Sequence, residues 1–456
     1  MPRLVPVVLG VALAAAACGD NQQASQFPTN DCSKFAQGRC IEIASGDSAA
    51  LQNATNSIEA NTTIVLGAGR FAMTNQVTIR TAGAHLIGQG IDVTTLDFAP
   101  VAAQVNGVDA IGDDFLIQDL TVLDAPKDGI RVEASKGVVY RRIRATWTAE
   151  ASSSNGAYGI YPVKSQNVLV ENSVAKNAAD AGLYVGQCQN VIVRNNTVSG
   201  NVAGLEIENT QYADVYNNIA ENNTGGIVVF DLPGNPIVGR DVRIRNNIIR
   251  NNNGVNFAAG GTVRSIPVGT GTFAMASRRV EITGNTYQNN QTGDIALISG
   301  LAIEQDVTKW VLPTATLAGK YDDLGLMSAA PGTVMNFRGE NIVVKGNTHA
   351  GSGTAPDLSD PLKLGLLLRL VYGTRAVDSV LYDSIGEPSF HSTDATMNTN
   401  ANHMCIGGET GATFASMSLA TQSPSSITPF FRPAAPFTPF NCTALAGGPV
   451  ADVVLP

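Results

Sequence analysis

The stretch AGLYVGQCQNVIVRNNTVSGNVAGLEIENTQYADVYNNIAENNTGGIVVF, residues 181–230, decides the fold of this chain. It repeats a glycine followed by an apolar residue, with the glycines at positions 182, 204 and 226. A second pattern, NVIVRNN from residue 190 and ADVYNN from residue 213, lies between these glycines. Such short alternating stretches, divided by Asn, Gly and Asp, are typical of strands and turns. Three short strands with their turns occupy about 20–25 residues, so the period predicts one coil of a parallel β-helix.

The same pattern extends on both sides of this stretch. DGIRV and YGIYP precede it, and DVRIRNN, RVEITGN and NIVVKGN follow it from residues 241, 279 and 341. Leucine-rich repeats need a framework that this chain lacks, and helical repeats are longer. We therefore predict an all-β solenoid of about eleven or twelve coils. Asparagines recur at equivalent turns, where they tolerate left-handed backbone geometry and where stacked amides can form ladders; they are Asn172, Asn195, Asn217 and Asn246.

Several segments resemble a known superfamily. ANTTIVLGAGRF, HLIGQG and TTLDF near the front, and GLEIEN, NNTGGIVVFDLPG and VRIRNNIIRNNN further on, look like the pectin-lyase-like superfamily of right-handed parallel β-helices. Within it they are most similar to exported bacterial β-helix repeat proteins of unestablished activity. The resemblance spans residues 40–350 and implies a right-handed parallel β-helix. It also implies a polysaccharide as ligand, because the superfamily includes pectate and alginate lyases, polygalacturonases, epimerases, tailspikes and adhesins.

The two ends of the chain differ from the repeat. We predict a signal peptide over residues 1–17, a linker over 18–40, the β-helix over 41–351 and a C-terminal capping region over 352–456. A helix is expected over 47–58, because an Asp/Ser cap precedes a helical pattern there, and it would cover the open edge of the first coil. Residues 301–339 interrupt the repeat and are expected to form an insertion. The region after 352 is rich in Pro, Ser and Thr and is expected to be an irregular tail.

The N-terminal segment MPRLVPVVLGVALAAAAC indicates export. It carries one charge, Arg3, and an apolar run that is short for a membrane span. It resembles a bacterial lipoprotein signal, with Cys18 as the lipidated first residue of the mature protein, and an ordinary cleaved secretory signal is the alternative. A lipid on Cys18 would anchor the protein in the cell envelope. The net charge of −9 and the pI of 5.0 argue against a nucleic-acid partner.

The cysteines fit an oxidising compartment. Cys32 with Cys40, and Cys405 with Cys442, are the natural local pairs for disulfides, which leaves Cys188 single and buried. Free thiols are the alternative.

Aligning the strands on their glycines places equivalent side chains in columns, because stacked coils lie about 4.8 Å apart. The residue after each glycine, for example Leu205, is expected to point inward. The next residue is expected to point outward, because side chains alternate along a strand. Glu206 and Glu208 should therefore share one solvent-exposed face, about 7 Å apart. The first outward column reads Arg131, Tyr161, Tyr184, Glu206 and Val228, and the second reads Glu133, Val163, Gly186, Glu208 and Phe230.

This face suits sugar binding, because aromatic rings pack on sugar rings and charged groups bind hydroxyls or sugar carboxylates. The candidate catalytic residues are Glu206, Glu208, Tyr184 and Arg131. The candidate substrate-binding residues are Tyr161, Tyr184, Lys164, Phe230 and Asp231. Ca²⁺ held by carboxylates would neutralise a uronate in a lyase- or epimerase-type reaction, and the candidate ligands are Asp180, Glu206, Glu208 and Asp231.

Three classes of function remain open. The first is a carbohydrate-active enzyme of the lyase or epimerase type. The second is a non-catalytic surface scaffold that interacts with another envelope component, since polar residues are ordinary on the outside of an exported solenoid. The signature motifs of polygalacturonases, alginate epimerases and pectate lyases do not occur in the sequence, so no standard mechanism can be carried over. A structural partner of another protein would instead present an apolar patch, for example near 301–337.

Overall fold

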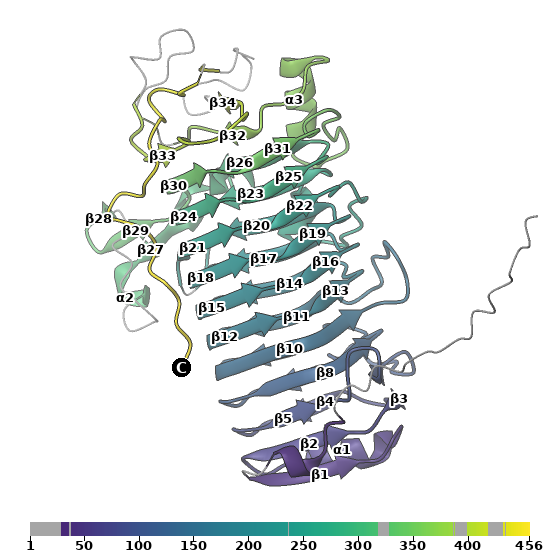
Figure 1. The fold of residues 1–456 in the computed structure, drawn as a ribbon. Coiled ribbons are helices and arrows are strands. Elements are labelled where there is room, and N and C mark those ends of the chain that lie inside the picture. The colour runs from purple at the N-terminus through teal and green to yellow at the C-terminus, as the bar shows by residue number, and fades with distance from the viewer. Residues whose placement is uncertain are drawn as a thin grey trace, which may run out of the picture.

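The structure is a computed structural model that describes residues 29–35, 38–235, 237–317, 328–385, 387, 399–417, 432–433 and 435–456. Within them the strands stack as rungs of a long solenoid (Figure 1). One side is an eleven-stranded parallel sheet. Its strands, from the N-terminal end, are β4 (Val77–Ile79), β7 (Val108–Ala110), β9 (Ile130–Glu133), β11 (Tyr158–Val163), β14 (Ala181–Gly186), β17 (Ala203–Glu208), β20 (Gly225–Phe230), β23 (Thr270–Met275), β26 (Gly293–Ile298), β32 (Val380–Tyr382) and β34 (Phe414–Ser416).

The other side is a twenty-stranded sheet, and in most coils it contributes two short strands separated by an asparagine turn. Its strands are β1 (Arg39–Ile43), β2 (Thr62–Leu66), β3 (Gly69–Ala72), β5 (His85–Ile87), β6 (Thr94–Asp97), β8 (Leu116–Leu123), β10 (Lys136–Thr146), β12 (Gln166–Glu171), β13 (Val174–Lys176), β15 (Gln189–Arg194), β16 (Thr197–Ser199), β18 (Gln211–Tyr216), β19 (Ile219–Glu221), β21 (Arg240–Arg245), β22 (Ile248–Arg250), β24 (Arg278–Thr283), β25 (Thr286–Gln288), β30 (Glu340–Lys345), β31 (Thr348–Ala350) and β33 (Met404–Cys405).

Alternation along the strands fills the interior of the solenoid. The residues after the repeat glycines, such as Leu183, Leu205 and Ile227, are fully buried in one continuous apolar core. Burying each such side chain contributes about 1.5–3 kcal/mol. Cys188 is a free cysteine buried in the same core.

The turn asparagines have two roles. Asn172, Asn195, Asn217 and Asn246 have φ values of 52°, 56°, 55° and 54°, the left-handed geometry expected of them. The hydrogen-bonded ladder is formed by the next residue in each coil, whose buried amide donates to the amide one coil further on. The first ladder contains Asn196, Asn218, Asn247, Asn285 and Asn347. A second, at the following turn, contains Asn201, Asn223, Asn252 and Asn290.

Both ladders end on a carboxylate toward the C-terminal end. Asn347 donates to Glu409 at 2.8 Å, and Asn290 donates to Asp294 at 3.2 Å. The His349 ring lies between these two acids, 2.9 Å from Asp294 through Nδ1 and 3.3 Å from Glu409 through Nε2. Burial acts to lower the pKa of His349, but hydrogen bonds with both carboxylates outweigh it and raise the pKa to about 9.

The ends carry additional elements. Helix α1 (Ser48–Asn56) contacts β1 and β4, and its Leu51 is fully buried in the core. The structure joins Cys32 to Cys40 and Cys405 to Cys442. The expected end of the β-helix at residue 351 is wrong, because β32, β33 and β34 continue the parallel pairing beyond it. Long connections separate these last strands, which hid them from the repeat pattern.

The remaining elements lie outside the two large sheets. The interruption after β26 contains a small antiparallel sheet of β27 (Val311–Pro313), β28 (Ser328–Ala330) and β29 (Thr333–Met335), with the short helix α2 (Thr314–Leu317). Helix α3 (Leu364–Tyr372) follows residue 351. Four 3₁₀ turns complete the described elements: η1 (Cys32–Lys34), η2 (Thr262–Ser265), η3 (Gly300–Ala302) and η4 (Val307–Trp310). No helix of the described residues is long and apolar enough to cross a membrane.

Candidate functional site

The predicted columns exist on the outer face of the eleven-stranded sheet. Arg131 lies beside Tyr161, Tyr184 beside Glu206, and Glu206 beside Val228. In the second column Glu133 lies beside Val163, Gly186 beside Glu208, and Glu208 beside Phe230. The registers therefore confirm both columns.

The prediction that this face is open to solvent is wrong at its centre. Glu206 is 1% exposed, Glu208 8% and Tyr184 4%. The connection between β22 and β23, residues 251–269, packs Val263 and Ile266 into a second apolar cluster with Tyr184. Further along the same cluster, Trp310 and α3 cover the last coils. The strand pattern could not reveal this cover, because the connecting segments that form it have no periodicity.

Three tyrosines form the middle of the site. Tyr158 lies with its ring centroid 4.6 Å from both Tyr161 and Tyr184, and Tyr161 and Tyr184 are 4.9 Å apart. The Tyr184 ring lies over Gly186, where a Cβ would overlap its ring and hydroxyl. The glycine in the second column therefore provides the space that the Tyr184 ring occupies.

Three carboxyl groups adjoin the tyrosines. The Tyr158 hydroxyl donates to Asp180, and the Tyr184 hydroxyl donates to Glu208. Burial and the carboxyls of Asp180 and Glu208 hold the pKa of Glu206 well above its usual range. Burial and the Glu208 carboxyl raise the pKa of Asp180 to about 7, although the Tyr158 hydrogen bond opposes this. These groups therefore retain protons in conditions where exposed carboxyls have lost them.

Asn235 completes the environment of Glu208. Its amide donates to Glu208 Oε1 at 2.8 Å and to Asn209 at 2.7 Å. Burial raises the pKa of Glu208, while the hydrogen bonds from Asn235 and Tyr184 oppose the shift. Burial also raises the pKa of Tyr161, to about 12. The hydroxyls of this cluster are therefore proton donors rather than phenolates.

The cations of this face are already paired. Arg131 forms ion pairs with Glu133 and with Asp109, the latter at 3.3 Å. Lys164 lies 3.3 Å from Glu133, and Arg80 pairs with Asp109. Arg131 and Lys164 therefore lie on the predicted face, but a ligand carboxylate would have to compete with these partners.

Phe230 and Asp231 are not part of a binding surface in this structure. Phe230 is buried in the second apolar cluster. Asp231 accepts two hydrogen bonds from the backbone N–H of Gly239, at 2.9 and 3.1 Å. Burial raises the pKa of Asp231 to about 7, and the nearby Arg278 opposes the shift. Asp231 thus organises the connection that follows β20.

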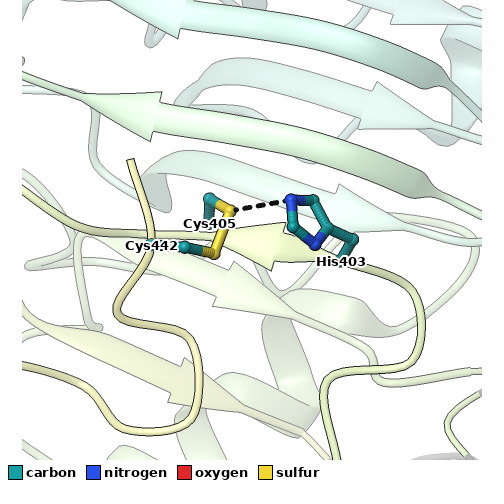
Figure 2. Close-up of side chains that lie close together, drawn as sticks. All are labelled: His403, Cys405 and Cys442. Carbon is teal, nitrogen blue, oxygen red and sulfur yellow. Dashed lines mark hydrogen bonds between the residues drawn. A yellow bond between two sulfur atoms is a disulfide. The ribbon is translucent and has the colours of Figure 1, made fainter. Parts of the chain in front are cut away.

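The four candidate calcium ligands do not gather into a cage. Among the residues that the structure describes, one group of three has ligand atoms within 4.8 Å of one another, and it is His403, Cys405 and Cys442 (Figure 2). Cys405 and Cys442 form a disulfide, so their sulfurs are not thiolate ligands. His403 lies 3.4 Å from the Cys405 sulfur and 3.0 Å from the Ala444 carbonyl. Neither the four candidate calcium ligands nor the group of His403, Cys405 and Cys442 therefore forms a metal site.

Sequence reasoning missed Tyr158 and Asn235. Strict alternation puts Tyr158 on the same side as Ile160, inside the solenoid, whereas its ring packs with the outer cluster. Asn235 lies in the connection after β20, which has no strand pattern. The one signal that could have found them is the excess of polar and aromatic residues around the two columns.

The comparisons with known proteins concern the fold. Residues 128–306 match the family model described as "Right handed beta helix region". The structure is similar to the A-module of a mannuronan C-5 epimerase from Azotobacter vinelandii, with a TM-score of 0.42, 14% identity and coverage of 74% of this chain and 88% of that chain. It is also similar to an alginate lyase from Paenibacillus sp. str. FPU-7, with a TM-score of 0.32, 14% identity and coverage of 57% and 90%.

A further similar structure is the Dettilon tailspike protein, with a TM-score of 0.37, 14% identity and coverage of 69% of this chain and 64% of that chain. None of the curated proteins that were compared matches the sequence. The parallel registers and the match over residues 128–306 together confirm the expected right-handed parallel β-helix.

Proposed function

We propose that this protein binds a polysaccharide along the outer face of the eleven-stranded sheet. The observation that carries the proposal is the cluster of three tyrosines and three carboxyls that adjacent coils hold in register. Tyrosine rings provide flat apolar surfaces for sugar rings, and carboxyls accept hydrogen bonds from sugar hydroxyls. The half-exposed Lys164 and Arg131 extend the polar strip toward the N-terminal coils.

Access to the cluster requires the cover to shift. Segment 251–269 contains no strand, and its one regular element is the four-residue turn η2. The two ends of the segment bond to neighbouring coils, as Asn252 and Asn253 do. Its middle, residues 256–266, is held from within, because the Asn256 amide donates to the carbonyls of Val263 and Ile266. This middle part can move without breaking the pairing of the sheet.

A binding screen with the purified protein tests the proposal. It should include acidic, neutral and amino polysaccharides, each with and without Ca²⁺. Tyr184→Phe, which keeps the buried ring, and Glu206→Gln should both weaken binding by about tenfold, the loss of one hydrogen bond to a charged or buried group. Glu221→Gln on the other sheet, where Glu221 pairs with Arg250, is the matched control. If no glycan binds, the proposal fails.

A second candidate function is processing of the bound polymer by lyase- or epimerase-type chemistry. It is favoured by carboxyls that hold protons near neutral pH beside tyrosine hydroxyls, since such groups can move protons to and from a sugar. Product formation would appear as ultraviolet absorbance of unsaturated sugars, or as a changed NMR spectrum of the recovered polymer. A non-catalytic envelope scaffold is the alternative, and the paired state of Arg131 and Lys164 favours it.

We propose in addition that the protein is exported and anchored in the cell envelope through a lipid on Cys18. The two disulfides support an oxidising compartment. Cys18 lies outside the described residues, so its role rests on the signal-like sequence. Cell fractionation of a Cys18→Ala variant tests the anchor.

A further inference from the structure

The carboxyl cluster of Asp180, Glu206 and Glu208 lacks a positive partner. Within the described residues no lysine or arginine forms an ion pair with any of the three, and none acts on their pKa values. Two other acids of the same face, Asp109 and Glu133, pair with Arg131, and Asp128 lies near Lys127 and Arg131. The absence of a cation is therefore local to this cluster and not general to the sheet.

Two oxygens of the cluster are also without hydrogen bonds. Oε1 of Glu206 and Oδ1 of Asp180 are buried, and no described residue donates to either. Buried acceptors are paired in the great majority of cases, because leaving one unpaired costs about 1–3 kcal/mol. Glu206 is 1% exposed and belongs to the rigid strand β17, so it cannot turn to solvent. Glu206 Oε1 and Asp180 Oδ1 are therefore placed to accept hydrogen bonds from a ligand.

The surroundings of the cluster favour an organic cation over a metal ion. Metal ions such as Ca²⁺ need several oxygens around one point, and the described carboxylates here do not form a group of three within 4.8 Å. Tyr158 and Tyr184, by contrast, lie beside the carboxyls and interact with them through their hydroxyls. An ammonium group needs fewer acceptors than a metal ion, and two of its hydrogens can satisfy Glu206 Oε1 and Asp180 Oδ1, the two oxygens without a donor.

We propose that Asp180 and Glu206, with Glu208 beside them, bind the ammonium group of an amino sugar in the polysaccharide through the two oxygens that lack a donor. This inference rests on the proposed function and names its substrate class. The half-buried Tyr158, Tyr161 and Asp180 form the open side of the cluster. Gly261 of segment 251–269 lies over Asp180, and a Cβ there would stand 3.3 Å from Oδ2. The amino group enters where this segment now rests.

Isothermal titration calorimetry of the full protein tests the inference with two matched probes, an oligosaccharide of glucosamine and the same oligosaccharide fully N-acetylated. The glucosamine oligomer should bind at least about tenfold more tightly, since acetylation removes the charge. Because the empty cluster retains protons, binding should release them, and the measured heat should change with the ionisation enthalpy of the buffer. Glu206→Gln should abolish both the preference and the proton release, and Glu221→Gln should change neither.

The outcomes separate the inference from the proposed function. Equal affinity for the two oligomers, or a preference for a uronate polymer, overturns the amino-sugar inference while polysaccharide binding stands. Tight binding of Ca²⁺ that Glu206→Gln removes also overturns it, in favour of a metal. Binding of neither oligomer, with no binding in the wider polysaccharide screen, overturns both. Preference for the free amine with proton release, lost in Glu206→Gln, supports it.

Discussion

Replacing Asn218 by alanine tests how much the amide ladder holds the coils together. The Asn218 side chain accepts from the backbone N–H and the amide of Asn196, both at 3.0 Å. It donates to the Val193 carbonyl and to the Asn247 amide oxygen, both at 3.0 Å. Asn218→Ala therefore removes four hydrogen bonds at a fully buried position.

The expected cost follows from these contacts. At about 1 kcal/mol for each lost bond, the free energy of unfolding should fall by on the order of 4 kcal/mol. An unfolding entropy of about 2.1 cal/mol/K per residue makes this about 4 °C in Tm if all 456 residues unfold together. A smaller cooperative unit, as is common in repeat proteins, would lose more.

Thermal melting followed by circular dichroism provides the measurement. Asn217→Gly is the matched control, because Asn217 is the exposed neighbour with a φ of 55°, which glycine adopts freely. That variant should stay within about 0.5 kcal/mol of the parent. If Asn218→Ala and Asn217→Gly melt at the same temperature, the ladder does not contribute to stability and the reasoning is refuted.

Four further outcomes are expected. Gly186→Ala should push the Tyr184 ring from its place, at a cost of about 1–3 kcal/mol, and should weaken glycan binding; unchanged binding would dismiss the role of Tyr184. His349, with its pKa raised to about 9 in the fold against about 6.5 in the unfolded chain, should contribute stability that is complete below pH ~6.5 and lost as pH rises through ~9. His349→Gln should flatten that pH dependence in denaturant titrations, and an unaltered profile would count against the ion pairs. Leu205→Asp should prevent folding, because it buries an unpaired charge in the core, and a native circular dichroism spectrum would contradict the inward assignment. Cys18→Ala should move the protein from the membrane to the soluble fraction, and unchanged partitioning would exclude the anchor.

The local pattern of the sequence predicts the coils well. Glycine spacing and alternation place Leu205 inside and Glu206 outside, and the observed registers agree. These features depend on residues close in sequence, which is why they can be predicted. The first asparagine of each pair, such as Asn217, has the expected left-handed turn geometry, whereas the second, Asn218, forms the ladder. Both residues look alike in sequence, and only the direction of the side chain after the turn separates them.

The candidate site was predicted in position but not in environment. The columns were correct, yet their centre is covered by segment 251–269, whose Val263 and Ile266 pack in one cluster with Tyr184 and which lies more than a coil away in sequence. The same holds for the pairing of Arg131, because Asp109 comes from an earlier coil. Contacts of this kind are set by tertiary packing, and no short-range pattern encodes them.

The two amide ladders give the solenoid a direction and an end. Every amide in them accepts a hydrogen bond from the preceding coil and donates one to the next. Each added coil therefore ends on an amide N–H that still needs an acceptor. A carboxylate accepts without donating, and Glu409 and Asp294 therefore stop the series, with His349 joining the two stops. Because the stops are separate from the repeated unit, whole coils can be added or removed ahead of them without a new arrangement of the terminus. The ladder thus makes the length of the protein adjustable in steps of one coil.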